Sequence, residues 1–230
     1  MIIQKTEEQL MFLNSLYKTH YILFFAFCFV ISTSFSQTTK KSKLLPYKIG
    51  ISYTFGTEDN FLFDDVDYSY SANIIKGQCI YKLGTWKNFQ FDLAVQPQFQ
   101  ILKHQLHNKW FVTSDIPDFL EKRIRFTKLK TMHLYVLEFG FIIQKKVYKN
   151  LNFRTSLSLG FSYIDTETER LAKGFTFIEN LFLGCSYQTS KKTAVYVGGN
   201  FGHVSNLDFQ QPNSGYNILG LEIGFNYFLN

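Results

Sequence analysis

His203 and Ser205 are the residues of this chain whose types and spacing could support nucleophilic catalysis. Side chains on a β-strand alternate between its two faces, so residues two apart lie on the same face with their side chains adjacent. A serine hydroxyl is a poor nucleophile unless a neighbouring base takes its proton, and an imidazole can fill that role. The spacing therefore predicts a site for nucleophilic attack by Ser205, with His203 as the base.

Asn217 joins this pair if the two flanking segments form a hairpin centred near Gln210, because His203 and Asn217 then lie opposite each other. In segment 193–206 the odd positions are otherwise mostly apolar, as they are at the end of the chain. The three polar side chains therefore continue an apolar face. Polar groups in lipid are costly and usually functional, so a Ser-His pair there would suit a hydrolase of lipid acyl esters. A cluster near the rim is also compatible with a purely interfacial role.

Period-two alternation of apolar and polar residues dominates the chain after Gln37 and indicates strands. It is clearest from Phe89 to Ile101, where Pro97 predicts a bulge or a local break. Eight strands are expected, at about 47–56, 68–82, 89–101, 131–147, 151–164, 175–188, 193–206 and 219–229.

Short and long connections between these strands alternate strictly. The short ones lie at about 83–87, 148–150 and 189–192, and the long ones at about 57–67, 103–130, 165–174 and 207–215. This alternation is typical of outer-membrane barrels, and only a closed barrel carries strands through lipid without an unpaired edge. We therefore predict an all-β, eight-stranded antiparallel outer-membrane β-barrel. The alternative is a soluble lipocalin-like barrel or sandwich, whose interior large aromatic side chains would overfill.

Two features of the long second loop carry further expectations. Asp115, with the acidic residues and Pro117 that follow it, predicts the start of a short helix. His104, His107 and His133 lie around the same loop and are expected to serve as loop or interface polarity.

Composition narrows the class of protein. The 230 residues are 46% hydrophobic and 18% aromatic, which excludes disorder, and a mean hydropathy of −0.08 is too polar for a helical membrane protein. Three cysteines make no disulfide framework, and the sequence suggests neither a metal site nor another cofactor. The net charge of +6 suits an anionic surface such as lipopolysaccharide phosphates. No basic run is dense enough for nucleic acid.

The N-terminus predicts export. Tyr21 to Phe35 form an apolar run of 15 residues, short of the roughly 20 that span a bilayer as a helix. With Lys18 before it and small residues after it, the run indicates a signal peptide over 1–36, with Met11 as an alternative start. Residues 37–230 then form the barrel domain, expected in the bacterial outer membrane.

The segment His203-Val204-Ser205-Asn206, followed by Gln211-Pro212-Asn213-Ser214-Gly215, resembles the C-terminal signature of the lipid A 3-O-deacylases (PagL) and the related bacterial acyloxyacyl hydrolases. The resemblance implies an eight-stranded outer-membrane barrel that removes an ester-linked acyl chain from lipid A without a metal. By the same resemblance, the expected binding partner is lipid A or lipopolysaccharide of the outer leaflet. A homodimer is possible. The resemblance also implies His203 as general base, Ser205 as nucleophile and Asn206 as an oxyanion-hole contributor.

One position departs from the family pattern, which places Glu or Asp where this chain has Asn217. An acid orients the histidine and stabilises its imidazolium, whereas an asparagine orients it without charge. Asp208 belongs to the loop, and Glu222 is expected to point inward. Two hypotheses follow: a lipid A ester hydrolase in which Asn217 holds His203, or a non-catalytic barrel that binds lipopolysaccharide or supports the membrane. A solute channel is a weaker third, because side chains fill so small a lumen.

Overall fold

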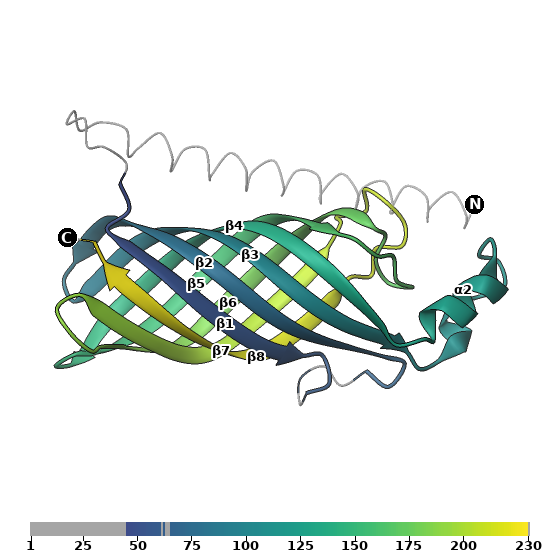
Figure 1. Ribbon diagram of the computed structural model, residues 1–230, viewed down its shortest axis with the longest axis horizontal. Coiled ribbons are helices and arrows are strands. Elements are labelled where there is room, and N and C mark those ends of the chain that lie inside the picture. Colours follow the sequence, from purple (N-terminus) through teal and green to yellow (C-terminus); the bar gives the residue numbers. More distant parts are fainter. Residues whose placement is uncertain (1–44, 61, 63–64, 230) are drawn as a thin grey trace, which may run out of the picture. The chain divides into compact units, whose positions relative to one another are not determined.

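The computed structural model describes residues 45–60, 62 and 65–229. The predicted signal peptide, 1–36, and its alternative start at Met11 lie outside these residues. Eight antiparallel strands form a closed barrel in chain order, with β8 paired to β1 (Figure 1). The strands are β1 (Lys48–Thr57), β2 (Tyr68–Trp86), β3 (Phe89–Leu106), β4 (Lys130–Tyr148), β5 (Leu151–Ile164), β6 (Gly174–Gln188), β7 (Thr193–Ser205) and β8 (Tyr216–Phe228). The predicted fold class is confirmed.

The two faces of the barrel distinguish a membrane barrel from a soluble one. Outward side chains are large and apolar and leave much of their surface exposed, as for Phe139 at 43% and Leu157 at 61%. Inward side chains include the buried polar groups Lys76, Glu138 and Glu222. A soluble lipocalin-like barrel would reverse this arrangement. We call the outward-facing side chains of the strands the outer wall. No helix in the described part of the chain is long and apolar enough to cross a bilayer.

Several strands extend further than the alternation predicts, and Pro97 does not form the bulge that the sequence suggests. β2 continues to Trp86 and β3 to Leu106. The β2–β3 register is the same on both sides of Pro97, and the register shifts instead at Lys82/Gly84, between β2 and β3, and at Lys146/Tyr148, between β4 and β5. Proline has no N–H to donate, so only the local pairing of β2 with β3 is interrupted. The predicted local break is therefore present, and the predicted bulge is not.

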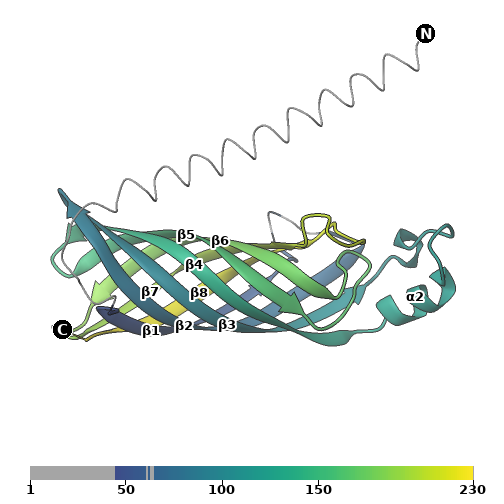
Figure 2. The same ribbon diagram turned by 90° about the horizontal axis from the view of Figure 1, so that it is seen from above.

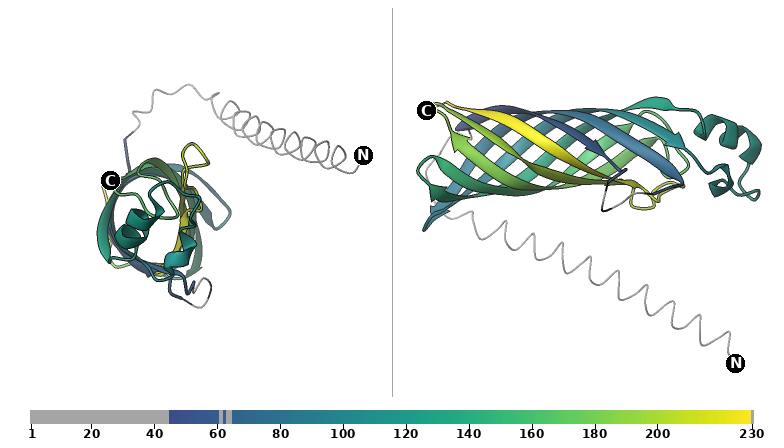
Figure 3. Two further views of the ribbon diagram at one scale, coloured as in Figure 1. Left: turned by 90° about the vertical axis from the view of Figure 1, so that its right-hand side faces the viewer. Right: turned by 90° about the horizontal axis from the view of Figure 1, so that it is seen from below.

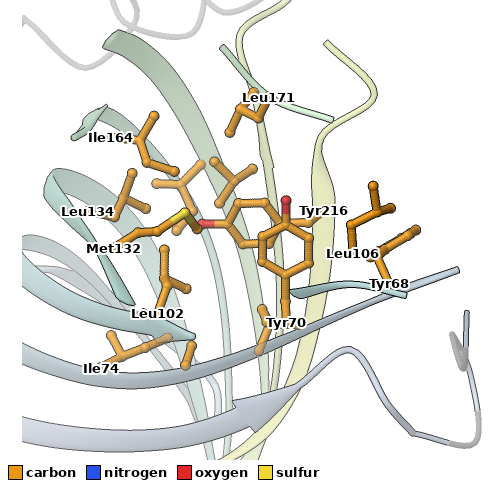
Figure 4. Close-up of a cluster of buried hydrophobic side chains, with 14 of the residues drawn as sticks. Tyr68, Tyr70, Ile74, Leu102, Leu106, Met132, Leu134, Ile164, Leu171 and Tyr216 are labelled. Carbon is orange, nitrogen blue, oxygen red and sulfur yellow. The ribbon is translucent and has the colours of Figure 1, made fainter. Parts of the chain in front are cut away.

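A hydrophobic cluster fills the barrel at the end that carries the long loops (Figure 4). Tyr70 stacks between His104 and Tyr216, with ring centroids 4.1 and 4.4 Å apart. His104 is fully buried, and its Nε2 lies 2.8 Å from Glu169 Oε2. The prediction that His104 provides loop polarity is therefore wrong, because β3 extends past it and turns its ring into the barrel.

The long second loop forms a short 3₁₀ helix, Lys109–Phe111, and α2 (Phe119–Phe126). The helix begins after Asp118 rather than at Asp115, so its predicted start is too early. α2 lies at the loop end of the barrel, the end that also carries the loop after β7 (Figures 1 and 2). Seen along the barrel, it overlies the ring of strands (Figure 3). Phe126 packs into the buried cluster, and Arg125 forms an ion pair of 2.6 Å with Glu167.

Candidate active site

The β7–β8 hairpin brings His203 and Asn217 together as the sequence predicts. The two residues are directly opposed in the register, and His203 Nδ1 lies 2.7 Å from Asn217 Oδ1. Because an amide oxygen only accepts hydrogen bonds, Nδ1 carries the hydrogen and Nε2 of the neutral ring carries a lone pair. A lone pair on Nε2 is what a general base requires.

Inward-facing neighbours determine that these side chains point outward. Val204 and Tyr216 oppose each other across the same two strands and are both buried in the hydrophobic cluster. Since faces alternate along a strand, anchoring these two residues inside places His203, Ser205 and Asn217 on the outer wall. The prediction that the three polar residues share the outward face is confirmed for this region of the barrel.

Gly215 lies beside both His203 and Ser205. Its φ of 64° is in the left-handed region that favours glycine. A Cβ there would collide with the Val204 carbonyl oxygen and would lie 3.2 Å from His203 Cε1 and 3.4 Å from Ser205 Cβ. The imidazole and the serine thus border one small space that only a glycine leaves open. No hydrogen bond joins His203 to Ser205 among the described residues, and such bonds often tighten only when substrate binds.

The loop after β7 is held by the loop between β5 and β6. Leu171 forms an isolated β-bridge with Asn213. The backbone carbonyl of Arg170 accepts from Ser214 N at 2.7 Å, and its Nε donates to the Gly215 carbonyl at 2.8 Å. These contacts fix the backbone that borders the His203–Ser205 space.

Asn206, predicted to contribute to an oxyanion hole, lies at the end of β7 with a buried side chain. Its backbone N–H donates to Asn213 Oδ1 at 2.6 Å, and its Nδ2 donates to the Gln210 carbonyl at 2.8 Å. Both kinds of donor are thus engaged in closing the loop. The oxyanion role of Asn206 stays a prediction.

Glu179 is a neighbour of the site that the sequence reasoning missed. It is opposed to His203 across β6 and β7, and its side chain is exposed on the outer wall. Its signal was available, because it interrupts an odd-numbered apolar row that runs from Phe175 to Leu183. Its nearness to His203 could not be inferred without the β6–β7 register. We call Glu179, His203 and Asn217 the β6–β8 row.

Glu222 and Asp208, the two other acidic residues considered as partners of His203, both bond to other residues in the structure. Glu222 points into the lumen, as predicted, and forms a 3.1 Å ion pair with Lys76. Asp208 lies in the loop after β7, where its Oδ1 accepts from Asn213 and Gln211. Over the described ranges, no group of three or more His, Cys, Asp or Glu side chains is placed to hold a metal ion.

Comparison with known proteins gives one family. The family described as lipid A 3-O-deacylase (PagL) matches residues 47–226. Similar solved structures include the outer membrane enzyme PagL, with a TM-score of 0.48 and 11% identity over 76% of this chain and 97% of that one. Neisserial surface protein A (NspA) is similar with a TM-score of 0.42 and 10% identity, over 79% and 96%. No curated protein matches this chain in sequence.

Proposed function

The chain belongs to the lipid A 3-O-deacylase (PagL) family of the bacterial outer membrane, and we propose that it hydrolyses an acyl ester of lipid A through Ser205 and His203. The observation that carries this proposal is the 2.7 Å bond between His203 Nδ1 and Asn217 Oδ1. It leaves Nε2 as the basic nitrogen of a histidine that shares a small space with Ser205. The site faces sideways from the barrel, where the acyl chains of the outer leaflet lie.

In the acylation step, Ser205 Oγ attacks the ester carbonyl carbon and His203 Nε2 takes the hydroxyl proton. The tetrahedral intermediate collapses, and the imidazolium returns that proton to the departing sugar oxygen. The products of this step are an acyl-Ser205 and the sugar hydroxyl. Asn217 keeps the ring in one orientation throughout by accepting from Nδ1–H.

In the deacylation step, water attacks the acyl-Ser205 carbonyl and gives a proton to His203 Nε2. Collapse of the intermediate returns the proton to Ser205 Oγ and releases a fatty acid. Asn206 directly follows Ser205 in the sequence, and its backbone N–H is the oxyanion donor that we propose. It would stabilise the oxyanion once substrate displaces Asn213 Oδ1 from it, and oxyanion donors of this kind are worth about 10²-fold or more in rate.

The test is incubation of the purified barrel with lipid A in detergent, with loss of an ester-linked acyl chain followed by mass spectrometry. Wild type is expected to release a fatty acid, whereas Ser205→Ala and His203→Gln are not. Ser190→Ala, in the exposed turn between β6 and β7 at the end of the barrel opposite the long loops, is the matched control. Turnover that persists in Ser205→Ala would contradict the assignment.

The competing hypothesis of a non-catalytic barrel rests on the missing charge at Asn217. It predicts that lipid A stays intact with wild type. Turnover by wild type would argue against it, whereas turnover that appears only in Asn217→Glu would attribute the loss of catalysis to the missing acid.

A further inference from the structure

We propose that Glu179 on β6 is a positioning residue that supplies, from the other side of His203, the negative charge that Asn217 lacks. This inference rests on the proposed hydrolase function. An acid beside a catalytic histidine does two things: it orients the ring and it stabilises the imidazolium. In this chain the two tasks are divided between the two strands that flank β7.

The register of three strands places Glu179 next to His203. His203 is opposed to Glu179 across β6–β7 and to Asn217 across β7–β8. Directly opposed residues on antiparallel strands have Cβ atoms about 5 Å apart and point to the same face. The carboxylate and the amide therefore flank the imidazole within one row on the outer wall.

Glu179 has no partner in its resting position. No hydrogen bond or ion pair involving it is present among the described residues. Its outward neighbours are Phe177 and Leu181 on its own strand and Leu159 on β5, all apolar. A carboxylate on such a wall is costly and is normally found with a function or a partner. The partner that the reaction creates beside it is the His203 imidazolium.

The other charged groups near His203 are already engaged. On the β8 side the neighbour is the uncharged Asn217. Arg170, from the loop between β5 and β6, donates to the Gly215 carbonyl. Asp208, in the loop after β7, accepts from Gln211 and Asn213. Glu179 is thus the charged side chain that lies in the same row as His203 on the outer wall.

Stabilisation of an imidazolium affects the chemical step and leaves substrate binding unchanged. A neutral isostere at position 179 is therefore expected to lower kcat with little change in KM. The same charge is needed whenever Ser205 is activated, whatever compound it attacks. A fluorophosphonate probe tests this without lipid A: Ser205 Oγ bonds to phosphorus, fluoride departs, and the hydroxyl proton passes to His203 Nε2.

The experiment measures the rate of fluorophosphonate labelling at Ser205 and of lipid A deacylation for Glu179→Gln and Glu179→Asp. Glu179→Gln is expected to slow both reactions about 10- to 100-fold, and Glu179→Asp is expected to retain part of the rate. Glu121→Gln, an exposed carboxylate in α2, is the matched control and should leave both rates unchanged. Glu179→Gln removes a charge from an apolar wall, so the barrel should fold.

The decisive variant is Asn217→Glu in the Glu179→Gln background, which returns one acid to the row from the opposite side. It should recover most of the lost labelling rate, whereas Asn217→Glu alone should change it less than about threefold. Wild-type labelling rates in Glu179→Gln would overturn the role of Glu179, even if lipid A is cleaved. Labelling that depends on Glu179 while lipid A stays intact would refute the proposed substrate and support the role. If wild-type Ser205 is not labelled and lipid A is not cleaved, both proposals fail.

Discussion

Two carboxylates on the strands that flank β7, Glu222 of β8 in the lumen and Glu179 of β6 on the outer wall, have opposite surroundings. Glu222 accepts hydrogen bonds of 2.9 to 3.1 Å from Thr54, Lys76, Tyr196 and Asn200. Glu179 has apolar neighbours and His203. The lumen satisfies the charge of Glu222 within the folded barrel, whereas the wall leaves the charge of Glu179 unsatisfied beside His203, the imidazole that we propose becomes cationic during the reaction. Polar residues inside this barrel are therefore expected to stabilise the fold, whereas those in the β6–β8 row are the ones that we propose take part in chemistry.

The largest effect should come from the wall. Ser205→Ala removes the nucleophile and is expected to reduce lipid A deacylation at least about 10³-fold, as measured by mass spectrometry of the acyl groups. The urea midpoint of unfolding should stay at the wild-type value, because the Ser205 side chain lies at the end of β7 outside the lumen. A lowered midpoint would show that wall polarity also supports the fold and would break the comparison.

The next largest effect should come from the lumen. Lys76→Met leaves Glu222 buried without its cation, and breaking a buried pair typically costs about 3 kcal/mol of unfolding free energy. Urea unfolding in detergent, followed by tryptophan fluorescence, would measure the loss. The double variant Lys76→Met/Glu222→Leu should recover part of it, because no unpaired charge remains. A single variant as stable as wild type would mean that the lumen pair does not hold the barrel.

A smaller effect is expected from Gly215, which lies at the end of the loop after β7, beside His203 and Ser205. Gly215→Ala strains a backbone with φ of 64° and crowds the Val204 carbonyl, His203 and Ser205. Because small misplacements at an active site are costly in rate, kcat should fall about tenfold, and the unfolding free energy should also fall by about 1 kcal/mol because the strain lies in the backbone. Gly199→Ala is the matched control, since a Cβ at Gly199 meets nothing within 4 Å. Equal kcat values for the two variants would remove Gly215 from the site.

The smallest effect concerns acid stability at the loop end. Burial alone would raise the pKa of Asp165, but hydrogen bonds from the backbone and side chain of His133 lower it below 3.8 overall. A carboxyl with a lowered pKa contributes stability above its ordinary pKa and loses it as the pH falls through the lowered value. Asp165→Asn should therefore reduce stability slightly at pH 7 and flatten its decline below about pH 4. Urea midpoints at pH 7 and pH 3 would check this, and an unchanged decline would contradict it.

Much of the candidate site could be predicted because it depends on local patterns. Alternation along β7 and β8 predicts the face of His203, Ser205 and Asn217, and a hairpin centred near Gln210 predicts that His203 meets Asn217. Asn206 could not be predicted in the same way: its place beside Ser205, the proposed nucleophile, suggests an oxyanion donor, yet the folded loop engages its N–H with Asn213. That contact joins residues whose spacing has no regular period.

The sequence by itself determined the class of barrel, the direction of each strand's side chains and the Ser-His-Asn grouping, because each follows from a two-residue repeat or from one hairpin between consecutive strands. Only the tertiary structure decided what else surrounds His203. The register of β6 against β7 places Glu179 in its row, and the bridge between Leu171 and Asn213 holds the loop that contains Gly215. A one-residue shift of register would reverse the faces that meet. The Leu171–Asn213 bridge joins loops that belong to two different hairpins, so no local repeat encodes it. The β6–β7 register is set by the short turn at 189–192, whose geometry the two-residue repeat does not specify.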